Sequence, residues 1–429
     1  MKKQLLTLLL CLPLLGMAQK TYVPDISFES SLEYIGAGDG IANNDSALTI
    51  SMQTLTELLY LNSIADFTGI EECIALEKFK FINTSNLNNP TLDLTNSTQL
   101  KVLELSGIPS SMVVIVNPIP LERLKLSSFS SSIGFNLNDF INLKSLTISN
   151  SSSFNTINIS SLIQLDSLQI FNSNLTTIDI TNNTQLKYLN LSYNALTSIN
   201  LAGNLLLNNV NLFSNDLTAI DVSNNATELE ILDVGKNLIA GVLDVTGATV
   251  LRKLVSRFNP NTGINISGLN EFRTLEFGFD SVASLDVSTN PELRNIDCKE
   301  GKIEALDFSN NPNMFNLLVT YCQNFSALNL QNGYWGGYID ISNNPNLFCT
   351  EVDSNRLYFN NGNFSLYDDN HNTYAFDCNY STAIGEVYST DKTLLKITDV
   401  LGRNAKGTKN IPLFYIYNDG TVEKKIIIE

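Results

Sequence analysis

A nine-residue frame returns at nearly constant spacing along most of this chain and limits what the chain can fold into. Its clearest copy, Leu186 to Asn194 (LKYLNLSYN), has apolar residues at offsets 0, 3 and 5 and asparagine at offset 8. Thirteen copies begin at Leu55, Leu76, Leu100, Leu121, Leu143, Leu165, Leu186, Leu207, Leu229, Leu251, Phe272, Leu293 and Met314. Successive starts lie 21 or 22 residues apart, with one step of 24. A constant period in this range indicates a solenoid of stacked coils.

Burial explains the frame. Side chains alternate along a strand, so Leu189 and Leu191 point inward while Tyr188, Asn190 and Ser192 point outward. One coil cannot bury its own leucines, whereas coils stacked about 4.8 Å apart share one core beside a parallel sheet. A second motif recurs between the strands, as in LTTIDITNN, LTSINLAGN, LTAIDVSNN, VASLDVSTN, IEALDFSNN and YIDISNN. We expect short strands or turns there, because so short a coil leaves little room for a helix.

The frame resembles that of the leucine-rich-repeat family over roughly residues 48–355. The resemblance implies a leucine-rich-repeat solenoid, with a curved parallel β-sheet on its concave side and short strands or turns on its convex side. It also implies that the offset-8 residue turns inward and bonds to neighbouring backbone. We expect repeats of 21–22 residues over 55–346. The offset-8 residues are Asn194, Asn215, Asn237 and Asn259 in the middle coils; elsewhere they are Ser63, Thr84, Ser151, Ser173, Asp280 and Cys322, or Ile108, Phe129 and Gly301.

The N-terminal residues carry two further signals. Residues 1–18 combine Lys2 and Lys3, a leucine-rich run and a small-residue cleavage site, which predicts a secretory signal peptide. In residues 19–54, Asp25 precedes Phe28 and Leu32 at helical spacing, and glycines follow. This segment is similar to the N-terminal cap of secreted repeat proteins of Bacteroidetes-type bacteria, which implies that it covers the first coil.

The regular repeats end after Met314. The next start in phase is Leu347, from which we expect a degenerate coil and a C-terminal repeat cap over 347–380. In the bacterial family, cysteines placed like Cys349 and Cys378 belong to this cap, and the resemblance implies a disulfide between them. The other cysteines of the exported chain are Cys73, Cys298 and Cys322. Five is an odd number, so at least one is free unless chains are cross-linked, and we expect Cys298 and Cys322 to be buried thiols.

Residues 381–429 have a different character. Short β-rich runs flank Asn418-Asp419-Gly420, a strong hairpin signal. Together, Thr398-Asp399-Val400-Leu401-Gly402-Arg403 and the terminal YIYNDGTVEKKIIIE resemble the type A C-terminal sorting domain of the type IX secretion system. The resemblance implies export across the outer membrane by that machinery, which leaves the protein released or attached to the cell surface.

Charge and motif content exclude several functions. The net charge is −17, and −19 without the two leader lysines, which argues against nucleic acid or an anionic membrane as partner. The single histidine, His371, lies among Asp and Asn, and no nucleophile, phosphate-binding or metal-ligand motif accompanies it. We therefore expect no cofactor, no metal and no catalysis. A hydrolase or enzyme accessory protein with an unrecognised carboxylate pair remains the alternative.

A row of aspartates recurs on the outer side. Its members are Asp179, Asp221, Asp244, Asp286, Asp307 and Asp340. Each one either accepts backbone N–H groups in a turn, as Asp commonly does, or belongs to a row of cation ligands.

The expected binding surface is the concave sheet. Its candidate contact residues are a basic cluster, Lys78, Lys80, Arg123 and Lys125, and a set of aromatic residues, Phe171, Tyr188, Tyr193, Phe213, Phe258, Phe279 and Tyr321. Apart from Tyr188, the aromatic residues lie at offsets 6 and 7 of their coils. Such a stripe favours contact with an extracellular protein or a glycan, or it shields the sheet edge by packing on itself. The sequence thus predicts a secreted or surface-bound, non-catalytic binding or adhesion protein.

Overall fold

The computed structural model describes residues 19–82, 91–108, 112–115, 120–128, 136–152, 154–333, 337–353, 364–378, 394–398, 412–417 and 422–426. The chain forms two compact units, Met1–Phe376 and Asp377–Glu429. The predicted signal peptide, residues 1–18, lies outside the described residues. Among the residues that are described, no helix is both long and apolar enough to cross a membrane.

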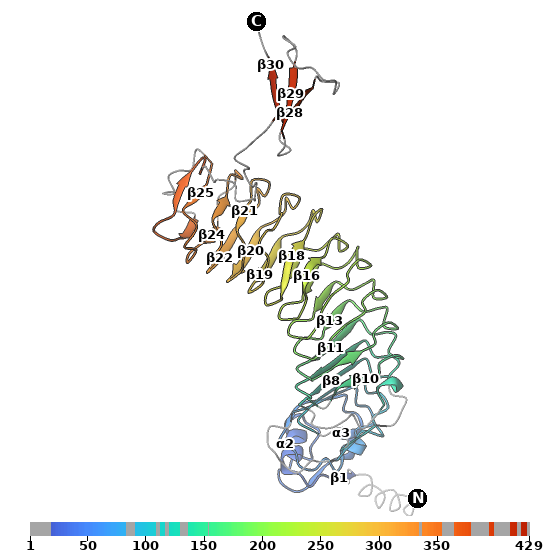
Figure 1. Cartoon of the computed structure of the whole chain (residues 1–429). Coiled ribbons are helices and arrows are strands. Elements are labelled where there is room, and N and C mark those ends of the chain that lie inside the picture. Colours follow the sequence, from blue (N-terminus) through green and yellow to red (C-terminus); the bar gives the residue numbers. More distant parts are fainter. Residues whose placement is uncertain are drawn as a thin grey trace, which may run out of the picture. The chain divides into compact units, whose positions relative to one another are not determined.

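A parallel sheet of 15 strands organises the first unit (Figure 1). Its strands pair in chain order: β3 (Glu57–Asn62), β4 (Lys78–Ile82), β6 (Val102–Ser106), β8 (Arg123–Ser127), β9 (Ser145–Ser149), β11 (Ser167–Phe171), β13 (Tyr188–Asn190), β14 (Asn209–Asn211), β15 (Ile231–Asp233), β17 (Lys253–Val255), β19 (Thr274–Gly278), β20 (Asn295–Lys299), β22 (Asn316–Thr320), β24 (Gly337–Asp340) and β26 (Phe364–Tyr367). Each predicted repeat start precedes one of the strands from β3 to β22. The predicted solenoid is confirmed.

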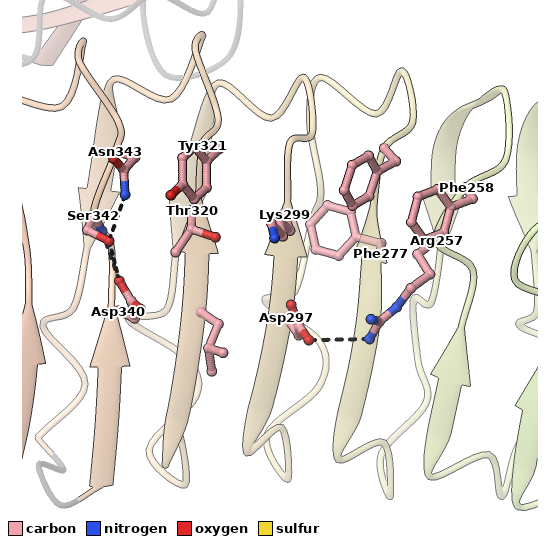
Figure 2. A pocket seen from close by; sticks show the side chains of 12 residues that line it. Arg257, Phe258, Phe277, Asp297, Lys299, Thr320, Tyr321, Asp340, Ser342 and Asn343 are labelled. Atoms are coloured by element: carbon pink, nitrogen blue, oxygen red, sulfur yellow. Dashed lines mark hydrogen bonds and ion pairs between the residues drawn. The ribbon is translucent and has the colours of Figure 1, made fainter.

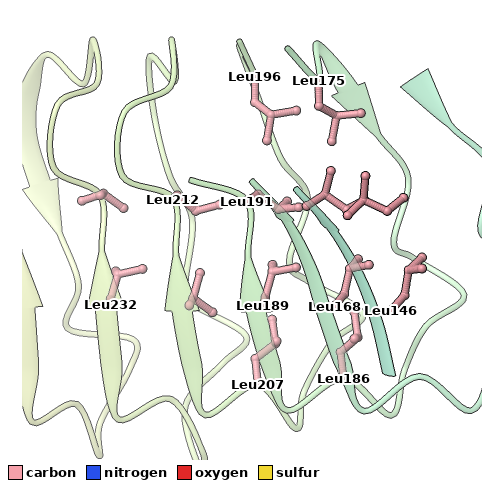
Figure 3. Packing of buried hydrophobic residues seen from close by; sticks show 14 of the residues in the cluster. Leu146, Leu168, Leu175, Leu186, Leu189, Leu191, Leu196, Leu207, Leu212 and Leu232 are labelled. Atoms are coloured by element: carbon pink, nitrogen blue, oxygen red, sulfur yellow. The ribbon is translucent and has the colours of Figure 1, made fainter. Parts of the chain in front are cut away.

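The leucines of the frame form columns that run from coil to coil (Figure 3). Leu146, Leu168, Leu189 and Val210 are register partners on neighbouring strands. All four are fully buried in one continuous core. Burial of one such side chain contributes about 2 kcal/mol, and each side chain is buried by the coils on both sides.

The offset-8 asparagines bind the coils together as the frame implied. The Nδ2 of Asn215 donates to the carbonyl oxygens of Leu191 and Leu212 at 2.9 and 3.0 Å, and its Oδ1 accepts from the Leu196 N–H at 3.1 Å. The corresponding residues of other coils make the same kinds of bonds. This inner asparagine ladder consists of Asn194, Asn215, Asn237, Asn259 and Asn344.

The outer side contains short parallel strands, as predicted. They are β5 (Leu92–Asp93) with β7 (Val113–Val114), β10 (Thr156–Ile157) with β12 (Thr177–Ile178), β16 (Gly241–Asp244) with β18 (Asn261–Asn265), and the row β21 (Ala305–Asp307), β23 (Ala327–Asn329), β25 (Cys349–Glu351) and β27 (Thr373–Ala375). A second, outer asparagine ladder, which the sequence reasoning missed, runs beside them. Its members, Asn183, Asn204, Asn225, Asn290 and Asn311, donate from Nδ2 to two carbonyls of the preceding coil. Each of them ends one of the recurring outer motifs, which was the available signal.

The N-terminal segment packs on the first coil. It comprises β1 (Lys20–Tyr22), α2 (Ile26–Tyr34), β2 (Ser46–Leu48) and α3 (Thr49–Gln53), and short 3-10 turns follow later at Ile70–Glu72 and Leu137–Asp139. The Asp25 carboxylate caps α2 through the N–H groups of Ser27 and Phe28 and also accepts from the N–H of Ala65 at 2.7 Å. One side chain therefore ties the helix to the repeats. Phe28 of this helix is buried.

The phasing expected after Met314 is wrong. Residues 337–340 form β24 of the main sheet, and Cys349–Glu351 form β25 of the outer row. Leu347 therefore starts no coil, and Asp340 lies on the main sheet rather than on the outer side. The error has a physical reason: YIDISNN (338–344) has the same alternation as the outer motifs, so local pattern alone does not separate the two sides. Tyr334, Trp335 and Gly336 lie outside the described residues.

The second unit contains an antiparallel sheet of three strands, β28 (Leu394–Thr398), β29 (Pro412–Tyr417) and β30 (Val422–Ile426). The pairing of β29 with β30 is the hairpin expected around 418–420. The motif residues 399–403 lie outside the described part of the chain.

Cys349 and Cys378 are joined by a disulfide, as predicted. Cys298 and Cys322 are buried and free, also as predicted, with 3.7 Å between their sulfur atoms.

Candidate functional site

The concave face is formed by the outward side chains of the main sheet, at offsets 2, 4, 6 and 7 of each coil. Its distinctive feature is the offset-7 residue, which has a positive φ of 51–61° in eleven successive coils. These residues are Ser128, Asn150, Asn172, Tyr193, Ser214, Lys236, Phe258, Phe279, Glu300, Tyr321 and Asn343. We call them the left-handed column.

The left-handed column follows from the turn that ends each strand. The Tyr193 N–H donates to the Phe213 carbonyl of the next coil at 2.8 Å, and the Phe258 N–H donates to that of Gly278 at 3.0 Å. Glycine and asparagine are the residues that tolerate this conformation, and it is an outlier for bulky side chains. Four of the eleven members are nevertheless aromatic. Strain that is kept at particular positions is a reason to infer a role for the side chains there.

The structure brings the predicted aromatic residues together in two pairs. The ring centroids of Tyr193 and Phe213 lie 5.3 Å apart, and those of Phe258 and Phe279 stack at 4.2 Å. Tyr193, Phe258 and Tyr321 are 53%, 42% and 47% exposed. The other two predicted residues, Phe171 at the end of β11 and Tyr188 at the start of β13, are half-buried.

A hollow of about 570 Å³ lies beside the second pair (Figure 2). We call it the β20 pocket, because Asp297 and Lys299 of β20 lie in its middle. Phe258, Phe279 and Tyr321 of the left-handed column line it. Its polar lining comes from Arg257, Asp297, Lys299, Thr320, Asp340, Ser342 and Asn343. The Lys299 ammonium lies 5.6 Å from the centre of the Tyr321 ring, a cation–π contact.

Ion pairs fix the charged groups at one side of this pocket. The Arg257 guanidinium pairs with the carboxylate of Glu276 and, at 3.3 Å, with that of Asp297. Lys253 adds a second cation to Glu276 at 2.6 Å. Burial raises the pKa of the Asp297 carboxyl, and the Arg257 charge opposes that shift. The pocket therefore presents charges of both signs together with aromatic rings.

Two of the four residues in the predicted basic cluster are paired with glutamates. Lys78 pairs with Glu57 of the preceding coil at 2.6 Å, and Lys80 lies 3.5 Å from Glu104 of the following coil. Arg123 and Lys125 are exposed on β8. The glutamates stand at the same offsets as the lysines they pair with, so the sequence contained the signal for this neutralisation.

The recurring aspartates close turns. The Oδ1 of Asp179 accepts from the Thr181 N–H at 2.9 Å, and Asp221, Asp244, Asp286, Asp307 and Asp340 each accept from the N–H two residues further on. These bonds lower the pKa of the Asp179 carboxyl, and the hydrogen bond from the Thr181 hydroxyl is the largest cause of that shift. The described residues contain no group of three His, Cys, Asp or Glu side chains able to hold a metal ion. The His371 ring lies 5.1 Å from that of Phe348.

Comparison with known proteins shows which fold the chain has. No family profile matches the chain, and no curated protein matches it. The functional domain of InlJ from Listeria monocytogenes, which includes a cysteine ladder, is 23% identical, with a TM-score of 0.57 over 78% of this chain and 76% of that chain. The internalin InlF from the same species is 18% identical, with a TM-score of 0.51 over 82% of this chain and 92% of that one. The chain has the solenoid fold of leucine-rich-repeat proteins.

Proposed function

We propose that this protein is a non-catalytic binding protein that recognises an extracellular protein or polysaccharide through its concave face. The aromatic members of the left-handed column carry the proposal. The same turn is made with Asn150, Asn172 and Asn343 in other coils, so the fold does not require rings there. A side chain that the turn disfavours and the core does not use is best explained by contact with a ligand.

The other candidate contacts take different places in this proposal. Phe171, Tyr188 and Phe213 extend the aromatic surface over β11 to β14. Arg123 and Lys125 supply positive charge at the other end of the face, where Lys78 and Lys80 are already paired. The β20 pocket adds a hollow with charges of both signs to the face that we propose for contact.

We also propose that the protein works outside the cell. Residues 1–18 would direct export, 19–54 and 347–380 would cover the ends of the repeats, and 381–429 would be read by the type IX machinery. The Cys349–Cys378 disulfide supports an oxidising compartment. Mass spectrometry of the exported chain tests this part: a mature N-terminus at Gln19 is expected, and a retained leader would contradict it.

The binding proposal is tested with arrays of extracellular proteins and glycans, probed with the full chain. The variant replaces Tyr193, Phe258, Phe279 and Tyr321 with Asn, the residue that three other coils carry at this place. We expect a ligand bound by the natural chain to lose at least about tenfold in affinity, since each buried ring contact contributes about 1 kcal/mol. The control replaces Lys236 and Glu300 of the same column with Asn and should bind normally.

Unchanged binding by the aromatic variant would remove the left-handed column as a site. The melting temperature of that variant should equal or exceed that of the natural chain, because Asn suits a positive φ better than an aromatic residue does. Loss of binding together with a lower melting temperature would also count against the proposal, since the rings would then be structural.

A further inference from the structure

Four adjacent strands of the concave face present no charged side chain. The outward residues of β9, β11, β13 and β14 form rows in register, Ser145–Ser167–Tyr188–Asn209 and Thr147–Gln169–Asn190–Asn211. The turn positions that follow are Ser149, Asn150, Phe171, Asn172, Ser192, Tyr193, Phe213 and Ser214. We call these sixteen residues the uncharged belt. The chain as a whole has 69 charged residues, so the belt is a local feature and not a consequence of composition.

Charge begins again at both edges of the uncharged belt. In the second row, Thr147 pairs in register with Lys125 of β8, and Asn211 pairs with Asp233 of β15. In the first row, Ser145 pairs with Arg123. Burial raises the pKa of the Asp233 carboxyl. The face thus changes abruptly from charged to uncharged at β9 and back again at β15.

Within the belt, the amide groups are held in one orientation. The Oδ1 of Asn190 accepts from the N–H and the hydroxyl of Ser192 at 3.0 and 2.7 Å, and the Oδ1 of Asn211 accepts from the Phe213 N–H at 3.0 Å. The opposite end of each amide, Nδ2, has no protein acceptor among the described residues. Two oriented donors therefore stand side by side on half-buried residues in the middle of the belt. The exposed Tyr193 and its partner ring Phe213 border them.

We infer that the uncharged belt binds a neutral polysaccharide, whose chain runs across the strands. The inference rests on the proposed function and names the ligand for this part of the concave face. Hydroxyl-rich rings need fixed donors, acceptors and an aromatic surface, and they gain nothing from ionised groups that would have to be desolvated. The core of a protein–protein interface is also rich in aromatic side chains, but it is enriched in Met and Arg as well. The outward positions of the belt contain no aliphatic side chain and no arginine.

The dimensions of the belt agree with a short segment of polysaccharide. Strands in a sheet lie about 4.8 Å apart, so β9 and β14 are separated by roughly 14 Å, the length of a few sugar rings. The face continues as charged groups beyond both edges. A neutral polysaccharide longer than the belt would reach these charged side chains but has no charge of its own to pair with them. Affinity should therefore stop rising once the polysaccharide is longer than the belt.

The test uses the full chain on immobilised neutral hexasaccharides of glucose, mannose, galactose and xylose, with oligogalacturonate as the charged counterpart. We expect at least one neutral probe to bind, with an affinity that changes less than about twofold when salt is raised tenfold, because no charge pair is screened. Asn190→Ala and Asn211→Ala should each weaken that binding by about tenfold, because each removes an oriented donor. Lys236→Asn, at the equivalent turn position of the first coil beyond the belt, is the matched control and should change it less than about twofold.

Three outcomes would overturn the inference: no binding to any neutral probe, binding only to oligogalacturonate, or neutral binding that Asn190→Ala and Asn211→Ala leave intact. None of these outcomes contradicts the proposed function, because that function is tested separately by the aromatic variant described above. Equal melting temperatures of the natural chain and the two Ala variants separate loss of contact from loss of fold.

Discussion

The middle coils and the coils that follow them hold together in different ways. Strands β13, β14, β15 and β17 have three residues each, and their coils carry Asn194, Asn215, Asn237 and Asn259 at offset 8. Strands β19, β20 and β22 have five residues each, and their coils carry Asp280, Gly301 and Cys322 instead. Where the side-chain amide bonds the neighbouring coil, the backbone pairs over a shorter stretch.

This difference also separates the two proposed binding regions. The uncharged belt ends on the coils of the inner asparagine ladder, whereas the β20 pocket lies over coils in which that ladder is interrupted. Gly278 leaves offset 6 without a side chain between Arg257 and Lys299, two residues that line the pocket. An interrupted ladder thus coincides with longer pairing and an uneven, charged face.

The largest expected effect comes from Gly278→Ala. Gly278 has a φ of +115°, and an added Cβ would lie 2.3 Å from the Lys299 carbonyl oxygen, so the β19–β20 pairing must give way. We expect a loss of about 3 kcal/mol in the free energy of unfolding, measured by urea titration. Gly235→Ala is the matched control at the same offset of a middle coil. There the three atoms nearest to the added Cβ belong to the side chains of Phe213, at 3.0 Å, and Asp233, so a loss below about 1 kcal/mol is expected. Equal losses would refute the contrast.

The next effect in size concerns the inner asparagine ladder. Asn194 donates from Nδ2 to the carbonyl of Ile170 at 2.7 Å and accepts from the N–H groups of Ser173 and Leu175. Asn194→Leu leaves these backbone groups unpaired, so we expect a loss of about 1–3 kcal/mol in unfolding free energy. Ile108→Leu, at offset 8 after the five-residue strand β6, removes no such bond and serves as comparison. An unchanged melting curve for the Asn194 variant would contradict the role we give to the ladder.

A gain is expected where the ladder is interrupted by a carboxylate. Asp280 accepts from the N–H groups of Gly278 and Val282, and burial raises its pKa above the ordinary 3.8. The folded state then holds the proton more tightly than the unfolded state, so this group lowers stability as the pH rises through its folded pKa. Asp280→Asn should therefore stabilise the protein by about 1 kcal/mol at neutral pH. The difference should shrink on acidification toward pH 3.8 in thermal melts, and a pH-independent difference would argue against burial as the cause.

The smallest effect is expected in the left-handed column. Phe258→Asn relieves an aromatic residue at φ +60° but removes its stacking on Phe279. Because the two effects oppose each other, we expect a net change within about 0.5 kcal/mol. Tyr193→Asn, in a middle coil, is the matched variant. A loss above about 2 kcal/mol for either would show that the ring is part of the fold and not free for a ligand.

Much of the fold was predictable because the core requires one residue type at each inward position. The starts from Leu55 to Met314 each mark a strand, since an error of one residue would expose the leucines. The repeat frame was assigned wrongly at Tyr338–Asn344, because strands of the main sheet and of the outer side have the same alternation of apolar and polar residues there.

The binding site was harder to predict from the sequence. Pairing of Lys78 with Glu57 follows from equal offsets, but the left-handed turn at Phe258 and the oriented amide of Asn190 depend on backbone geometry that no spacing reveals.

The register of the main sheet has a consequence for how such a protein changes over time. Each coil supplies the same inward side chains and touches only the coils beside it, so duplication or deletion of one complete coil preserves the interior. The outward row would gain or lose a single position in the process. Recombination between coils can therefore lengthen, shorten or change the binding surface by one coil at a time, while the packing of the core stays the same.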